Sequence, residues 1–179
     1  MKSLLLVVAA IASLTACGQG NKAKPEDKSK RPSPPALAKE TLSSGAVVTI
    51  DYSQPSVKGR TVGKDLEPKQ GQVWRAGANE ATTFEVSKDV KVEGQPLPAG
   101  KYAFFTLWNK DDSWTLIFNK QAETWGAYDY DKNKGKDALK VNVKPGKASS
   151  PAEKLTYTIS KDGKVSLLWS DVQVDFNVQ

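Results

Sequence analysis

Hydrophobic residues alternate with polar residues along much of the chain after its first forty positions. Three segments show the pattern clearly: residues 48–52 (VTIDY), 155–159 (LTYTI) and 172–178 (VQVDFNV). Every second side chain of an extended strand points to the same face of a sheet, so this period predicts strands that bury one face. The β-strand is therefore expected to be the dominant element.

Two further segments, Tyr102–Trp108 and Trp114–Phe118, are apolar on both faces, as expected of strands inside a sheet. Residues 109–112 (NKDD) between them have turn chemistry, and Asp162-Gly163 indicates a second hairpin. About nine or ten short strands with regular turns predict an all-β domain. The expected fold is an antiparallel β-sandwich with jelly-roll-like topology, with a closed β-barrel as the alternative.

The N-terminal part of the chain has a different pattern. Residues 4–16 form an apolar run of 13 residues after Lys2, which is too short to span a bilayer and is typical of a signal peptide. Residues 18–40 contain four prolines among Lys, Ser and Asn and almost no large apolar side chain, which predicts a disordered linker. The expected organisation is a signal peptide over 1–16, a tether over 17–40 and one β-sandwich domain over 41–179.

The end of the apolar run, Leu14-Thr15-Ala16-Cys17, resembles the lipobox of bacterial lipoproteins. This resemblance implies that Cys17 carries a diacylglyceryl group and becomes the mature N-terminus, anchoring the protein to a membrane of the cell envelope. Gly18 follows where sorting signals for the inner membrane have Asp, which favours the outer membrane, with the domain in the periplasm or at the cell surface. Cys17 is the only cysteine, so no intramolecular disulfide is possible.

The formal net charge of +6 is concentrated near the N-terminus. From Thr41 onward there are 19 basic and 17 acidic residues, so the domain is nearly neutral. Binding of nucleic acid needs a strongly basic face. Nucleic acid is therefore not expected as a partner, whereas the basic tether can face anionic lipid headgroups.

The segment Val73–Val86 (VWRAGANEATTFEV) has strand composition at its ends and a charged bend between them. The bend is expected to be a sheet corner closed by an ion pair between Arg75 and Glu80, with Asn79 bonding the backbone around Gly77. Two alternatives remain open. The bend could form the edge of a ligand pocket, or Glu80 could act as a general acid or base if apolar neighbours raise its pKa.

One of the five tryptophans is expected to be exposed. Trp125 stands next to Gly126 and outside the alternating strands, whereas most of the tryptophans are expected in the core. An exposed indole near Arg, Asn and Glu side chains offers a flat apolar face beside planar hydrogen-bonding groups. That combination suits a sugar or another polar ring ligand.

Absent residue types limit the chemistry. The chain contains no histidine, and its one cysteine is assigned to the lipid, which excludes Ser-His-Asp, Cys-His and His-based zinc machinery. Residues 129–140 resemble a calcium loop but have Lys134 at the sixth position, where Gly is needed, and Lys140 at the twelfth, where a bidentate Glu is needed. No metal ion, no cofactor and no catalytic residue is therefore assigned, and a role other than catalysis is favoured.

A series of motifs resembles the bacterial family catalogued as domain of unknown function 2911. The motifs are SVKGR (56–60), VWRAGANEATTFEVS (73–87), VEGQPLPAGKYAFFTL (92–107), WTLIFNK (114–120), WGAYDYD (125–131) and LLWSDVQVDF (167–176). Members of the family are secreted or lipid-anchored envelope proteins with no established activity. The resemblance implies a functional constellation of Arg60, Trp74, Arg75, Asn79, Glu80, Trp125 and Tyr128.

Three functions are compatible with these observations. The favoured hypothesis is a lipid-anchored module that binds a glycan or another small polar ligand through this constellation. A scaffold or interaction protein of the cell envelope is the second. A histidine-free hydrolase that uses Glu80 is the third.

Overall fold

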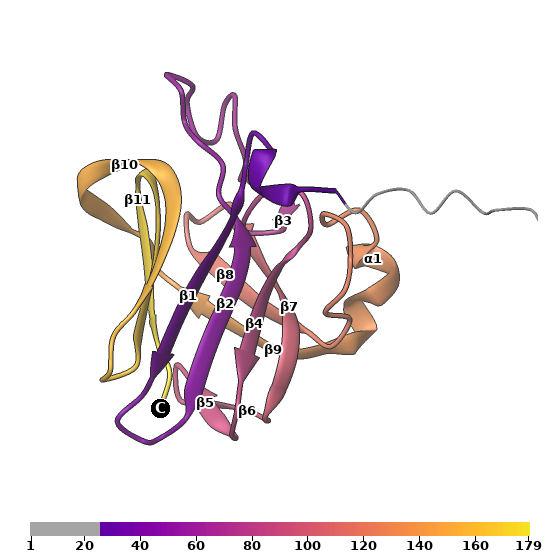
Figure 1. Ribbon diagram of the computed structural model, residues 1–179, viewed down its shortest axis with the longest axis vertical. Helices are drawn as coiled ribbons and strands as arrows, with labels where there is room; N and C mark the ends of the chain where they lie inside the picture. Colours follow the sequence, from indigo (N-terminus) through magenta and orange to yellow (C-terminus); the bar gives the residue numbers. More distant parts are fainter. Residues whose placement is uncertain (1–25) are drawn as a thin grey trace, which may run out of the picture.

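The computed structural model describes residues 26–179 (Figure 1). The expected signal peptide over 1–16 and the expected lipidation site Cys17 lie outside the described residues. Within the described range, no helix is long and apolar enough to cross a membrane.

A large antiparallel sheet forms one layer of the fold. Its strands are β1 (Pro35–Thr41), β2 (Val47–Ser53), β4 (Thr82–Val86), β7 (Gly100–Trp108), β8 (Trp114–Asn119) and β9 (Asp137–Val143), in that spatial order, and β3 (Val73–Trp74) also pairs with β7. From β1 to β9, the spatial order of these strands is therefore the same as their order in the chain.

Two long strands form the facing layer. β10 (Gly146–Ile159) and β11 (Lys164–Asn177) pair as an antiparallel ribbon with register shifts, and β5 (Val90–Val92) pairs with β6 (Gln95–Leu97) as a small separate hairpin. The sheets are not closed into a barrel, so the sandwich expected from the alternating pattern is confirmed and the alternative of a closed barrel is wrong.

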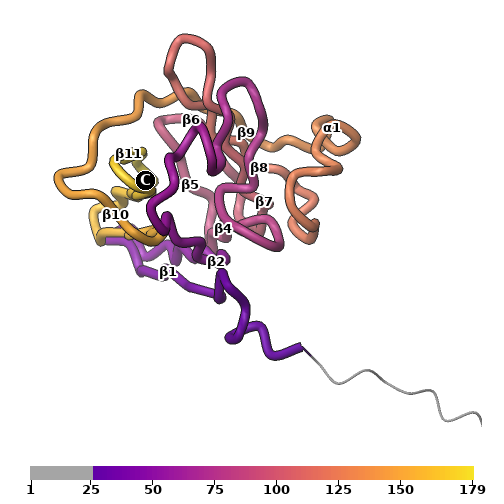
Figure 2. The backbone as a smooth tube through the Cα atoms, turned by 90° about the horizontal axis from the view of Figure 1, so that it is seen from above, coloured from indigo at the N-terminus to yellow at the C-terminus, as the bar shows by residue number. Residues whose placement is uncertain are grey.

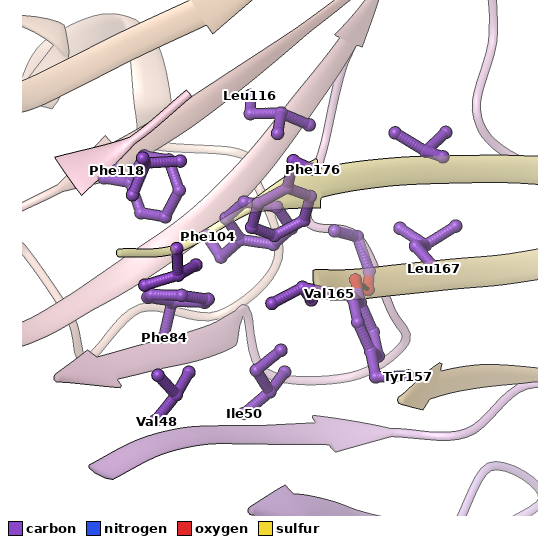
Figure 3. Packing of buried hydrophobic residues seen from close by; sticks show 14 of the residues in the cluster. Val48, Ile50, Phe84, Phe104, Leu116, Phe118, Tyr157, Val165, Leu167 and Phe176 are labelled. Atoms are coloured by element: carbon purple, nitrogen blue, oxygen red, sulfur yellow. Dashed lines mark hydrogen bonds between the residues drawn. The ribbon is translucent and has the colours of Figure 1, made fainter. Parts of the chain in front are cut away.

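Aromatic side chains from both layers meet in the main core. Phe84 of β4 and Phe104 of β7 pack against Phe176 of β11, with the ring centroids of Phe104 and Phe176 5.9 Å apart, and Phe118 of β8 packs against Phe84 and Phe104 (Figure 3). All four side chains are at most 1% exposed. The inward-facing side chains of the alternating strands thus interdigitate between the two layers and form the core.

The second face of β7 and β8 is also covered. Phe105 and Ile117 point to a smaller cluster with Tyr130, which belongs to the short helix α1 (Tyr130–Asn133), followed by the 3-10 turn η2 (Lys134–Lys136). The view in Figure 2 places the β10–β11 ribbon on one side of β7 and β8 and α1 on the other. The prediction that these two strands are buried on both faces is therefore confirmed.

The boundary of the domain differs from the expected one. β1 occupies residues 35–41, of which 35–40 were predicted as linker, and pairs with β2 along its whole length. A 3-10 turn, η1 (Lys28–Lys30), precedes it. The linker prediction is wrong for these residues because backbone pairing orders a strand whose inward side chains, such as Ala36 and Ala38, are too small to give a strong apolar signal.

Candidate functional site

The bend between β3 and β4 is held by hydrogen bonds between buried groups. The indole Nε1 of Trp74 donates to the carbonyl of Gly77 at 3.2 Å. The carbonyl of Ala76 accepts from Thr82 Oγ1 at 2.9 Å and from the Tyr157 hydroxyl at 2.7 Å. The bend is thus fixed to β4 and to β10 at once.

Backbone geometry at the bend explains its small residues. Ala76 and Asn79 have φ values of 52° and 57°, in the left-handed region that short side chains tolerate best. A Cβ atom at Gly77 would lie 2.7 Å from Thr82 Oγ1, which is closer than real contacts allow. Glycine at this position is therefore a packing requirement.

The expected ion pair between Arg75 and Glu80 is wrong. Among residues 26–179, Arg75 forms no salt bridge, and its buried Nε has no hydrogen-bond partner. Glu80 pairs instead with Lys28 and Arg31. The physical reason is that these two cations reach the carboxylate from a segment far away in sequence.

We call residues 26–34 the N-terminal strap. Lys28 Nζ lies 2.8 Å from Glu80 Oε1, and Arg31 Nη1 lies 2.8 Å from Glu80 Oε2, so each carboxylate oxygen has its own cation. Asn79 Nδ2 donates to the carbonyl of Ser33 at 3.0 Å. Asn79 therefore bonds the strap, and not the backbone around Gly77 as expected.

Trp125 lies beside the same carboxylate. The Arg31 guanidinium carbon is 5.8 Å from the centroid of the Trp125 ring, within the range of a cation–π contact. Trp125 also forms an antiparallel bridge with Glu80, and the amide of Gly126 donates to the carbonyl of Asn79 at 3.1 Å. These bonds position an indole that is 54% exposed, which confirms the prediction that Trp125 lies at the surface.

The environment of Glu80 stabilises its ionised form. Partial burial favours the neutral carboxyl group, but the bonds from Lys28 and Arg31 outweigh burial and lower the pKa of Glu80 from 4.5 to about 2. The hypothesis that apolar neighbours raise this pKa is therefore wrong. A carboxylate that stays ionised and paired at neutral pH is poorly suited to deliver a proton.

A pocket of about 560 Å³ opens next to this cluster, and we call it the Glu80 pocket. The strap contributes Lys28, and the sheet contributes side chains from adjacent strands: Asp51 of β2, Thr83 of β4 and Lys101 of β7. The loop after β8 contributes Glu123, Thr124 and Trp125. The pocket therefore combines hydroxyl groups, charges of both signs and two aromatic residues, Tyr52 and Trp125.

The remaining members of the expected constellation have different surroundings. Trp74 is buried and supports the bend. Arg60 is exposed and donates to the carbonyls of Ser56 and Val57 in its own loop. Tyr128 is 77% exposed, and its ring lies against Gly126. A Cβ atom placed on Gly126 would lie 2.8 Å from Tyr128 Cε2 and 3.0 Å from Arg75 Nη1, so both residues lie beside Trp125 without lining the Glu80 pocket.

Several residues in and around the pocket were missed from the sequence. Lys28 and Arg31 lie in a segment predicted to be disordered, and nothing in its composition indicates a partner. Asp51 and Thr83 are the polar members of alternating strands and face each other in register. The alternation assigns them to the outer face, but it carries no signal that this face is hollowed.

A second hollow of about 400 Å³ lies elsewhere in the structure. Its walls are mainly apolar and include Val62, Pro68, Trp108 and Trp114. None of the residues expected to be functional lines it. Within residues 26–179, no group of three or more Asp, Glu, Cys or His side chains is arranged to hold a metal ion.

Comparison with known proteins gives a family but no activity. No curated protein and no solved structure matches the chain. A family profile described as a protein of unknown function (DUF2911) matches residues 33–178, which include the bend, Trp125 and nearly all of the sandwich. Residues 26–32 of the strap precede the matched region. The chain therefore belongs to the DUF2911 family.

Proposed function

We propose that this protein is a lipid-anchored, non-catalytic binding module of the cell envelope whose ligand is a glycan or another small polar molecule. The observation that carries the proposal is the Glu80 pocket, in which a half-exposed indole lies beside polar side chains from three adjacent strands and a loop. Its volume of about 560 Å³ is within the range of small-molecule sites.

The chemistry of the lining supports a polar ring as the ligand. The exposed face of Trp125 can stack on the apolar face of a sugar or a similar ring. Thr83 and Thr124 offer hydroxyl groups, and Asp51 and Lys101 offer charged hydrogen-bonding groups. The low pKa of Glu80 supports binding over proton transfer.

The cellular setting is part of the same proposal. The leader pattern that ends at Cys17 supports a membrane anchor, with Gly18 favouring the outer membrane. The domain would then present its pocket in the periplasm or at the cell surface, where glycans and small polar solutes are available. Its partners are the membrane, through the lipid, and the ligand.

The test is a ligand screen read by intrinsic tryptophan fluorescence and by thermal unfolding, over neutral and charged sugars and small polar metabolites. A ligand of the Glu80 pocket is expected to change the emission of Trp125 and to raise the unfolding temperature. Trp125→Ala is expected to weaken binding by about tenfold or more, as for aromatic anchors at binding sites.

Trp108→Phe serves as the control because it removes a different indole that lies outside the Glu80 pocket. Binding that survives Trp125→Ala but is lost in Trp108→Phe would reassign the site to the second hollow. A panel that leaves fluorescence and stability unchanged throughout would contradict the proposal.

A further inference from the structure

The two cations on Glu80 differ in how tightly they are held. The Arg31 side chain is 12% exposed, and besides Glu80 it bonds Glu26 and makes a cation–π contact with Trp125, so it is fixed by three partners. The Lys28 side chain is 54% exposed, its ammonium has Glu80 as its only salt-bridge partner within residues 26–179, and it lines the pocket. Arg31 therefore acts as an anchor, whereas Lys28 is free to leave.

Departure of Lys28 changes the charge of the lining. With Lys28 in place, the pocket has three acidic side chains, Asp51, Glu80 and Glu123, and two basic ones, Lys28 and Lys101. Without it, three acidic groups face one basic group on the lining. Asp51 and Glu123 form no salt bridge with any residue of 26–179, so neither carboxylate has a directly paired cation. An incoming cation would restore the balance.

The position of the ammonium also fits a ring ligand. Lys28 and Glu80 both line the pocket, Lys28 Nζ lies 2.8 Å from Glu80 Oε1, and Glu80 is bridged through its backbone to Trp125. A ring that stacks on Trp125 can therefore present an amine to the carboxylate oxygen that Lys28 now occupies.

We propose that Glu80 Oε1 and Trp125 form a subsite for a protonated primary amine carried on a sugar-like ring, and that Lys28 fills this subsite from within the chain when no ligand is bound. The inference rests on the proposed function, since it names the ligand class of the same pocket. It adds that the ligand is cationic and that Lys28 competes with it.

Competition between Lys28 and the ligand amine for Glu80 determines how much each substitution should change the affinity. An exposed ion pair contributes little, so Lys28 should be easily displaced and its removal should raise the affinity for an amine by about threefold. Loss of the Glu80 charge removes a charge-assisted hydrogen bond and should lower that affinity by about tenfold or more. Both effects should fade at high ionic strength.

The experiment compares two disaccharides of the same linkage, one of glucosamine and one of N-acetylglucosamine, which differ in the charge of the nitrogen. Calorimetric titration at low salt uses the wild-type chain and the variants Lys28→Gln, Glu80→Gln and Lys30→Gln. Lys30→Gln is the matched control because it removes an ammonium two residues away that is bound to Asp27 and is 83% exposed. Circular dichroism and thermal unfolding verify that each variant is folded.

The amine is expected to bind about tenfold more tightly than the acetylated sugar, with a gain in Lys28→Gln, a loss in Glu80→Gln and no change in Lys30→Gln. Equal affinity for the two sugars, or equal behaviour of Lys28→Gln and Lys30→Gln, would overturn the inference and leave a neutral ligand for the pocket. Absence of binding by the amine in every variant would also overturn it, and the fate of the proposed function would then depend on the wider panel.

Discussion

At the scale of single residues, the carbonyl of Ala76 organises the bend beside the pocket. It accepts hydrogen bonds from Thr82 and from Tyr157, and the Tyr157 ring packs edge-on against Tyr52 with centroids 4.8 Å apart. Burial raises the pKa of Tyr157 well above 10, so its hydroxyl remains protonated and donates. Through this bond β10 supports the bend that carries Glu80.

Removing only that hydroxyl group tests its contribution. Tyr157→Phe is expected to lower the free energy of unfolding by about 1 kcal/mol, because the carbonyl of Ala76 loses one of its two buried donors and keeps the other. Urea denaturation measures the change. Tyr128→Phe removes the hydroxyl of an exposed tyrosine and should leave stability unchanged. Equal stability of Tyr157→Phe and the wild-type chain would mean that the bend does not depend on β10.

At the scale of elements, the sheet and the strap hold Glu80 through different kinds of bond. The sheet holds Glu80 through backbone bonds between β4, the bend and the loop after β8, which are independent of charge. The strap holds Glu80 mainly through two ion pairs. Protonation of this one carboxylate should therefore weaken docking of the strap without unfolding the sandwich.

The pH range of this effect follows from the pKa of Glu80. Because folding lowers the pKa from 4.5 to about 2, the stabilisation is fully present above pH 4.5 and is lost as the pH falls toward 2. The difference in unfolding free energy between the wild-type chain and Glu80→Gln should thus be constant from pH 7 to 5 and shrink below 4.5. Denaturant titrations at each pH measure it.

Glu85→Gln is the control for this series because it removes an exposed carboxylate of β4 that forms no salt bridge within residues 26–179. The difference in unfolding free energy between the wild-type chain and Glu85→Gln should not show this dependence on pH. A wild-type advantage over Glu80→Gln that persists undiminished to pH 2 would show that the strap does not rely on the ionised carboxylate.

The sequence predicted these elements unequally. The alternation in β2 and β11 and the double-sided apolarity of β7 gave the correct strands, because each signal is local and large side chains carry it. The strap has no such signal. Lys28 and Glu80 are 52 positions apart, and charged residues in a Pro-rich segment look the same whether they are solvated or paired.

The site was predictable to the same partial extent. The exposure of Trp125 followed from its place outside the alternating strands, and the unusual composition of the bend had left open that it borders a pocket, which Glu80 does. The pairing of Glu80 with Arg75, five positions away, was the wrong choice because a local partner is the natural guess from sequence, whereas the fold brings cations from the strap. Hollowing of the outer face at Asp51 and Thr83 depends on three-dimensional shape, which alternation does not encode.

At the scale of the whole molecule, the proposed anchor determines where the pocket would operate. Eight residues, 18–25, separate Cys17 from the first described residue, and a chain of that length spans at most about 30 Å. The strap and the Glu80 pocket would therefore remain near the membrane surface rather than extend far from it.

Substitution of the proposed lipid attachment site tests this setting. In a bacterial host that processes lipoproteins, the wild-type protein is expected to partition into detergent and membrane fractions, whereas Cys17→Ser should move to the aqueous fraction because it has no acyl chains to insert. Mass spectrometry of the mature N-terminus provides the second measurement. An unmodified Cys17 in the wild-type protein, or identical fractionation of the two proteins, would contradict the anchor.

The route of the chain through the strap has a mechanical consequence. Any tension on the tether would enter the domain at Glu26 and load the strap contacts one after another: Glu26 with Arg31, Lys28 and Arg31 with Glu80, and then Ser33 with Asn79. Contacts loaded in series peel at low force, whereas the seven paired residues of β1 and β2 share a load among many bonds. Stretching the tether would thus expose Glu80 while the sandwich stays intact, so that a pull from the bilayer could act on the pocket before it acted on the fold.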